Sequence, residues 1–230
     1  MCPRSSGPAT ISTSSPNSAT SEITTPDCVP TDTISRVAYS YASTALHPAI
    51  LHHSLRVFLY ARTLAQREHP IWSSPDRLAL LFAACIYHDI GTVCGADSPQ
   101  RFEVEGADLA AQNLRSANVP EHDVHEVWVA IAVHTSPHIA ERISPLARLV
   151  RLAVLVDFKV AVQVKDFPTE AEVEVNEALF PRLDAAKVLG DAVVAQTVRR
   201  PEKAPSASWP SVLLRSRVEN PGWEGVNKAF

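Results

Sequence analysis

Several features are scarce or absent in this sequence of 230 residues, and each absence narrows the protein class. No apolar run reaches the roughly 20 residues that a bilayer-spanning helix needs, so we expect no membrane association. The first residues lack the apolar stretch of a secretory signal, which favours a cytoplasmic location. Positive charge is not in excess, because the net charge is -4, so the chain offers no basic surface to nucleic-acid phosphates.

Cysteines are few and have no motif spacing. The four cysteines are Cys2, Cys28, Cys85 and Cys94, and no two of them form a CxxC pair. A disulfide framework is unusual in a chain of this length, so free thiols in a reducing compartment are the better interpretation.

Composition divides the chain into three parts. Residues 1–32 are rich in Ser, Thr and Pro and poor in large apolar side chains, which predicts a disordered tail. Residues 33–200 have the apolar periodicity of helices and predict a single helical core. Residues 201–230 contain four prolines and predict an irregular extension that packs on the core.

The periodic segments predict an all-α fold, because no segment alternates as a half-buried strand would. Pro48, Ser74–Pro75 and Ser144–Pro145 have the residue types of helix starts. Gly91 is expected to end the helix that follows Pro75. The stretch 146–164 is mostly apolar and predicts one long, buried helix.

Potential metal ligands stand inside these apolar helices. They are His53 in "HHSLRVF", the adjacent His88 and Asp89 in "YHDIGT", His134 in "AVHTSPH", and Asp157 in "LAVLVDFKV". A divalent metal needs several nitrogen or oxygen donors that converge from different elements. An unpaired carboxylate at Asp157 would be heavily penalised among Leu, Val and Phe, which indicates a cation or strong hydrogen-bond donors beside it.

Structural explanations compete with metal binding at each position. His88 and Asp89 could form a polar helix end, although the helix dipole disfavours an aspartate there. Asp157 could pair with a basic side chain instead of a metal. Arg151 and Lys159 have the wrong spacing to face it along one helix, so such a partner would come from elsewhere in the chain.

Taken together, these residues resemble the ligand pattern of the HD-domain superfamily of metal-dependent enzymes. The family order of His, then His-Asp, then Asp is matched by His53, His88–Asp89 and Asp157. The chain is similar in particular to the fungal cyanamide hydratases, in "VPTDTISRVAYSYAS", "HSLRVFLYA", "ALLFAACIYHDIGT", "RFEVEGA", "AIAVHTS", "SPLARLVRLAVLVDF" and "NPGW". The resemblance runs from about residue 30 to the end and implies an HD-domain helical bundle.

The resemblance also implies a function. His53, His88, Asp89 and Asp157 would hold one Zn²⁺, with Fe²⁺ or Mn²⁺ as alternatives, and activated water would add to a small neutral C≡N substrate such as cyanamide. A second metal would need His134 and one of His122, His125 or His138, and we favour a single ion. The expected roles are catalysis for His134 and Thr92 and substrate binding for Thr135 and Glu103. Exposed apolar helix faces would permit a homodimer.

Three other functions stay open at this stage. An isocyanide or an organic nitrile could replace cyanamide in the same reaction. An HD phosphohydrolase is disfavoured, because such members often carry Lys where this chain has Thr92. A degenerate binding module would be expected to have lost a ligand residue, and all four are present.

Overall fold

The structure, a computed structural model, describes residues 25–94 and 98–220, and within them it contains helices and no strand. The predicted all-α class is therefore confirmed. The α-helices are α1 (Thr33–Ala45), α2 (Pro48–Glu68), α3 (Pro75–Tyr87), α4 (Phe102–Ser116), α5 (Glu121–Ala132), α6 (Ala140–Ile143), α7 (Pro145–Asp157), α8 (Glu170–Leu179), α9 (Ala185–Arg199) and α10 (Trp209–Glu219). Short 3₁₀ turns are η1 (Pro70–Ser73), η2 (Ile90–Thr92) and η3 (Pro201–Lys203).

The helix starts follow local sequence signals. Asp32 accepts a hydrogen bond from the backbone N–H of Ser35 at 2.9 Å, and Ser144 accepts one from that of Ala147 at 3.1 Å. Prolines occupy the first turns of α2, α3 and α7, where the missing N–H has no acceptor to lose. These starts were predictable because a cap acts within three or four residues.

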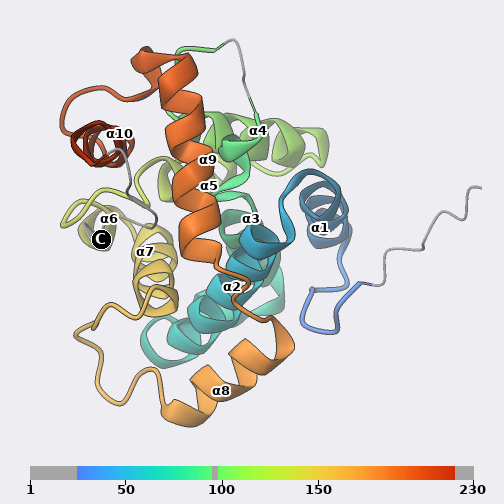
Figure 1. The fold of residues 1–230 in the computed structure, drawn as a ribbon. Coiled ribbons are helices and arrows are strands. Elements are labelled where there is room, and N and C mark those ends of the chain that lie inside the picture. Colours follow the sequence, from blue (N-terminus) through green and yellow to red (C-terminus); the bar gives the residue numbers. More distant parts are fainter. Residues whose placement is uncertain (1–24, 95–97, 221–230) are drawn as a thin grey trace, which may run out of the picture.

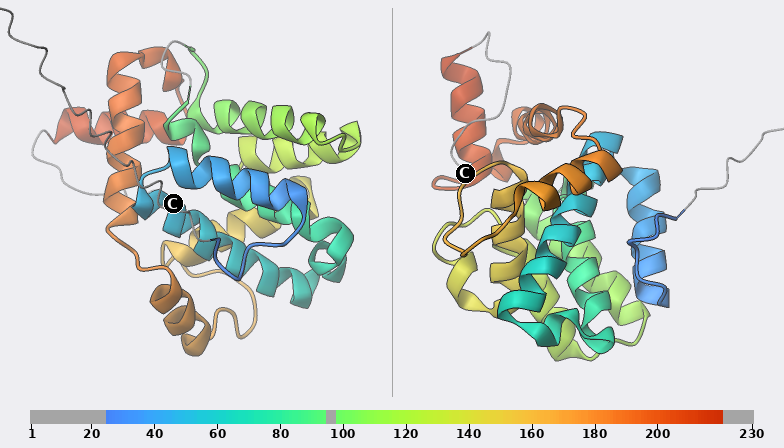
Figure 2. Two further views of the ribbon diagram at one scale, coloured as in Figure 1. Left: turned by 90° about the vertical axis from the view of Figure 1, so that its right-hand side faces the viewer. Right: turned by 90° about the horizontal axis from the view of Figure 1, so that it is seen from below.

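Helices α2, α3, α5 and α7 pack on one another to form the centre of the bundle. In Figure 1, α9 crosses the front of this bundle, where it contacts α2, and α10 lies beside α9. The views in Figures 1 and 2 place α10 and α1 on opposite sides of the molecule. None of the helices within the described residues combines the length and apolar character of a bilayer-spanning helix.

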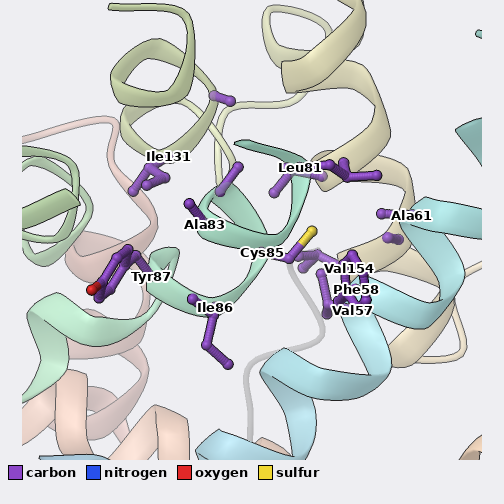
Figure 3. Packing of buried hydrophobic residues seen from close by; sticks show 14 of the residues in the cluster. Val57, Phe58, Ala61, Leu81, Ala83, Cys85, Ile86, Tyr87, Ile131 and Val154 are labelled. Carbon is purple, nitrogen blue, oxygen red and sulfur yellow. The ribbon is translucent and has the colours of Figure 1, made fainter. Parts of the chain in front are cut away.

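The core beneath the functional residues is tightly filled. Figure 3 shows Val57 and Phe58 of α2 beside Cys85 of α3 and Val154 of α7. The rings of Phe58 and Phe82 meet edge to face with their centroids 4.9 Å apart. Each such buried side chain stabilises the fold by about 1.5–3 kcal/mol. These contacts hold α2, α3 and α7 together and so fix the backbone from which their polar side chains project.

Two helices end earlier than the sequence predicted. Helix α7 stops at Asp157 rather than continuing to residue 164, and Lys159 has a left-handed backbone with φ of 60°. The apolar residues beyond Asp157 pack against the core although they lie in a loop, so an apolar sequence does not indicate a helix here. Helix α3 ends at Tyr87, and Gly91 lies in η2 instead of at the helix end.

The terminal segments also differ from expectation. Within the extension predicted to be irregular, residues 209–219 form α10, with Ser208 as its N-cap and Pro210 in its first turn. Trp209 and Leu213 are buried in the core. Of the tail predicted as disordered, residues 1–24 lie outside the described residues, whereas Val29 is buried.

Gly91 allows η2 and α4 to approach closely, and its replacement gives a first prediction. A Cβ at Gly91 would lie 1.8 Å from the carbonyl oxygen of Phe102, which belongs to the backbone and cannot rotate away. We expect Gly91→Ala to lower the free energy of unfolding by about 1–3 kcal/mol or more, measured by denaturant titration. The control is Gly106→Ala, whose Cβ meets its nearest atom at 3.0 Å. Equal stability of both variants would contradict this packing.

Candidate metal centre

His53 projects from the second turn of α2 and is buried. Its Nδ1 lies 2.6 Å from Oδ2 of Asp157 at the end of α7. A carboxylate can only accept, so the Nδ1–H of His53 is the donor. The other ring nitrogen, Nε2, is therefore left with a free lone pair.

His88 and Asp89 follow the last turn of α3, and both are buried. The Nδ1 of His88 lies 2.7 Å from the carbonyl oxygen of Cys85. This carbonyl fixes the proton on Nδ1, as Asp157 does for His53. The Nε2 of His88 then faces Nε2 of His53 at 3.1 Å and Oδ2 of Asp89 at 3.1 Å.

His134 reaches the same point from the turn after α5. Its Nδ1 lies 2.7 Å from the carbonyl oxygen of Ile131, and its Nε2 lies 3.5 Å from Oδ1 of Asp89. Arg151 of α7 holds this turn, because its Nη1 donates to the carbonyl oxygen of His134 at 3.1 Å. A third imidazole thus presents an unprotonated Nε2.

The convergent atoms are therefore all acceptors. Both carboxylate oxygens of Asp89 are buried without a hydrogen-bond partner. Acceptors packed together in a dry site repel one another unless a cation lies between them. One ligand atom each from His53, His88 and Asp89 can be chosen with all three within 4.8 Å of one another.

The separations between these atoms fit a small divalent ion. The Nε2 of His53 lies 3.1 Å from Nε2 of His88 and 3.4 Å from Oδ2 of Asp89. A tetrahedral zinc with bonds of about 2.0–2.1 Å requires ligand atoms roughly 3.3 Å apart. His53, His88 and Asp89 could thus hold a metal with little movement.

Burial and charge act on these groups in opposite directions. Burial by itself would raise the pKa of Asp89, but the imidazoles of His88, His134 and His53 beside its carboxylate outweigh burial and hold that pKa well below its usual range. Burial lowers the pKa of His53 despite the hydrogen bond to Asp157. Burial also disfavours charged His88, yet the nearby Asp89 carboxylate outweighs this and raises the pKa of His88. Asp89 thus stays anionic. Its charge favours a cation beside it, which can be a proton on the His88 imidazole or a metal ion.

Asp157 lies on the other side of His53, away from the point where the ligand atoms meet. Arg56 of α2 grips it with two hydrogen bonds, Nε to Oδ1 at 2.6 Å and Nη2 to Oδ2 at 2.8 Å. The Nη1 of Arg56 donates to the carbonyl oxygen of Phe180 at 2.8 Å. Burial opposes ionisation of Asp157, but the bonds from His53 and Arg56 outweigh it and lower its pKa. The partner expected from elsewhere in the chain is thus Arg56.

Thr92 is near the centre but does not face it. Its Oγ1 donates to the backbone carbonyl of Asp89 at 2.7 Å and so stabilises the turn of η2. Gln196 of α9 holds the same turn by donating to the carbonyl oxygens of Gly91 and Thr92, each at 2.8 Å. These contacts position Asp89.

Glu103 and Thr135 form a polar pair beside the centre. The hydroxyl of Thr135 donates to Oε1 of Glu103 at 2.6 Å, and Glu103 is fully buried. The guanidinium of Arg101 pairs with Glu103 and also donates to Oγ1 of Thr135 at 3.2 Å. Glu103 therefore fixes Thr135 and does not itself line the pocket.

The candidate ligands border a narrow pocket that the surrounding side chains almost fill. Its walls are Val154, Phe158, Leu189 and Trp209, and its polar lining is His53, His88, Asp89, His134 and Thr135. No Lys or Arg is among the described residues that line it. The other histidines considered for a second metal, His122, His125 and His138, are exposed.

Sequence reasoning missed three residues that shape this site. Arg56 stands three residues after His53 and hence on the same helix face, which is a signal that could have been used. Leu189 and Trp209 carry no such signal, because their periodicity resembles that of any helix that packs on a core.

Comparisons with known proteins agree with this geometry. A family model described as the HD domain matches residues 50–153. Two Saccharomyces cerevisiae proteins, named cyanamide hydratase DDI2 and cyanamide hydratase DDI3, are each 26% identical to this chain over 178 residues. That similarity covers 75% of this chain and 76% of each relative. The family match includes His53, His88, Asp89 and His134 and ends before Asp157.

The buried ion pair gives a second prediction. We expect Arg56→Met to lower the free energy of unfolding by about 3–5 kcal/mol, because it removes both hydrogen bonds from the guanidinium to the buried Asp157 carboxylate and leaves Arg182, at 3.7 Å, as its nearby cation. Chemical denaturation with circular dichroism measures the change.

Arg148→Met is the matched control, because Arg148 also joins α7 to α2 through two hydrogen bonds, in this case to Glu68. That pair is partly exposed, at 30% and 25%, so its loss should cost under about 1 kcal/mol. A loss at Arg56 no greater than that at Arg148 would refute the importance of the buried pair.

Proposed function

Because residues 50–153 of this chain form an HD domain, we propose that the protein is a metal-dependent hydro-lyase that converts cyanamide to urea. The observation that carries the proposal is the lining of the small pocket at the centre, which combines His, Asp and Thr side chains with apolar walls and has no cationic side chain among its described residues. Such a pocket suits a small, neutral molecule. The two Saccharomyces cerevisiae relatives, both named cyanamide hydratase, support the same reaction.

We assign the metal to Nε2 of His53, Nε2 of His88 and the carboxylate of Asp89. Zn²⁺ fits this donor set, with Fe²⁺ or Mn²⁺ as alternatives. When bound, such an ion acts as a Lewis acid and lowers the pKa of water towards about 7.

Asp157 has a different role from the one that the family pattern predicts. It holds the proton on Nδ1 of His53 and thereby directs the Nε2 lone pair into the centre, in the way that a carboxylate commonly orients a ligating histidine. Arg56 in turn fixes Asp157. The fourth predicted ligand thus becomes a positioning residue.

His134 is the group placed to move the proton. Its Nδ1–H is bound to the carbonyl of Ile131, so its Nε2 can accept a proton from water and return it to the substrate nitrogen. In the reaction, water oxygen bonds to the nitrile carbon of cyanamide and the nitrile nitrogen gains a proton. Proton transfer from oxygen to nitrogen then gives urea, so that one water is added in total.

Thr135 accounts for a preference for cyanamide over other C≡N compounds. Its hydroxyl hydrogen is used on Glu103, so towards the pocket its oxygen can act only as an acceptor. The amino group of cyanamide supplies an N–H donor, whereas an alkyl nitrile or isocyanide has none. Nitrile or isocyanide hydration is the second candidate, and parallel assays separate it from cyanamide hydration.

A phosphohydrolase finds less support. Phosphate recognition uses Lys or Arg, and neither lines the pocket among the described residues. The hydroxyl of Thr92 is bonded to a backbone carbonyl and does not supply a donor.

The third prediction tests the reaction itself. Metal-loaded protein should form urea from cyanamide and leave phosphomonoesters unchanged, with metal content measured on the same sample. Removing the metal with a chelator should abolish urea formation, and adding Zn²⁺ back should restore it. His88→Ala should bind little metal and lose at least about 10³-fold in kcat/KM. Full activity of a verified metal-free sample would end the proposal.

The fourth prediction separates a ligand from a positioning residue. Asp89→Asn should lose the metal, whereas Asp157→Asn should keep full occupancy at saturating metal with affinity reduced about 10–100-fold. Competition with a chromophoric chelator measures both affinities. Loss of stoichiometric metal binding in Asp157→Asn, with helicity retained, would make Asp157 a ligand after all.

A further inference from the structure

A second, wider pocket lies next to the narrow one and shares two residues with it. The outer pocket has a volume of about 370 Å³, and Thr135 and Trp209 line both pockets. Its other walls include Arg101, Ile139 and Val212. Thr135 and Trp209 therefore stand between the outer pocket and the candidate ligands.

The indole of Trp209 is held in a defined place. It is the first residue of α10, which starts with Ser208 as N-cap and Pro210 in the first turn. Its side chain is only 5% exposed, and its ring centroid lies 5.9 Å from that of Phe102. Phe102 in turn packs on His134 at 5.8 Å. Phe102 thus contacts both Trp209 and His134, the histidine that faces Asp89.

The outer pocket carries no uncompensated charge. Arg101 is the only charged side chain among the described residues that line it, and its guanidinium is paired with the buried Glu103 carboxylate. A neutral molecule can enter such a pocket without losing strong solvation, and an anion gains no free cation there.

We propose that the substrate reaches the centre from the outer pocket, between Thr135 and Trp209, and that Trp209 sets its upper size. This inference rests on the proposed hydration reaction and specifies its substrate class, namely cyanamide with at most a very small substituent. Trp209 lines both the narrow pocket, which side chains almost fill, and the wider outer pocket of about 370 Å³. A smaller side chain at position 209 would connect the narrow pocket with the outer pocket. An alkyl substituent of the substrate could then be accommodated there.

The first test compares cyanamide with its N-ethyl derivative, which keeps one N–H. The ratio of kcat/KM for N-ethylcyanamide to that for cyanamide should rise at least about tenfold in Trp209→Leu, since one methylene in a pocket is worth 10–200-fold. Trp209→Phe should give an intermediate ratio. Because a ratio is measured within one variant, a general loss of stability or metal does not imitate the effect.

The second test leaves Trp209 in place. Val212→Trp should fill the outer pocket and lower kcat/KM for cyanamide at least about tenfold, with metal content and unfolding midpoint unchanged. The control is Val218→Trp on the same helix, because Val218 is 69% exposed and lines neither pocket. That variant should hydrate cyanamide at the wild-type rate.

The outcomes separate this inference from the proposed function. Absence of urea formation by the metal-loaded wild type would reject the function itself. Active wild type, an unchanged ratio in Trp209→Leu and an unaffected Val212→Trp would reject only the entry route and the size limit. If the Trp209 variants do not fold, the pair of Val212 and Val218 variants decides.

Discussion

The buried ion pair between Arg56 and Asp157 is the interaction on which the centre depends. Moving a guanidinium and a carboxylate out of water costs several kcal/mol for each ion, and attraction offsets that cost only with good geometry. Here Arg56 makes two bonds to the carboxylate and one to the carbonyl of Phe180, while His53 makes a further bond to the same carboxylate. An apolar pair of similar size could be equally stable. What the ion pair adds is direction, because it fixes the tautomer and the orientation of His53.

The same logic applies to the other two imidazoles, with backbone carbonyls in place of the carboxylate. Cys85 and Ile131 hold the Nδ1 protons of His88 and His134. A carbonyl from its own helix therefore fixes the tautomer and the orientation of each of these two histidines without a metal. The cost appears at Asp89, whose two oxygens are buried beside three nitrogen lone pairs without a donor. A metal bound at this point would relieve that repulsion and would thereby couple metal affinity to folding stability.

Sequence reasoning reached the parts of this arrangement that depend on neighbouring residues. The starts of α2, α3 and α7 follow from proline and capping residues within one turn. The end of α7 was missed, because the residues after Asp157 are as apolar as those before it and only tertiary packing turns the chain. The sequence does not predict helix α10, because its prolines are typical of irregular structure, although proline is well tolerated in a first turn.

In the candidate site, too, the features that depend on neighbouring residues were predictable, and those that depend on tertiary packing were not. The His53, His88 and Asp89 set follows from polar residues placed where burial would otherwise be costly. The partner of Asp157 could be predicted only as a basic side chain from another element. The three-residue spacing places Arg56 on the same helix face as His53, but that Arg56 is the partner of Asp157 also depends on how α2 packs against α7.

The walls of the pocket show why the ligands alone do not determine the reaction. His53, His88, Asp89 and His134 lie within residues 50–153, the part that matches the HD domain. Leu189 and Trp209, which close the pocket, lie beyond that part, on α9 and α10. A set of acceptors that holds a divalent ion can serve an anionic or a neutral substrate, depending on whether cations and space surround it. The later helices supply apolar bulk rather than charge to the walls of this candidate site, and in the proposed function that wall is what would limit the substrate to small, neutral molecules.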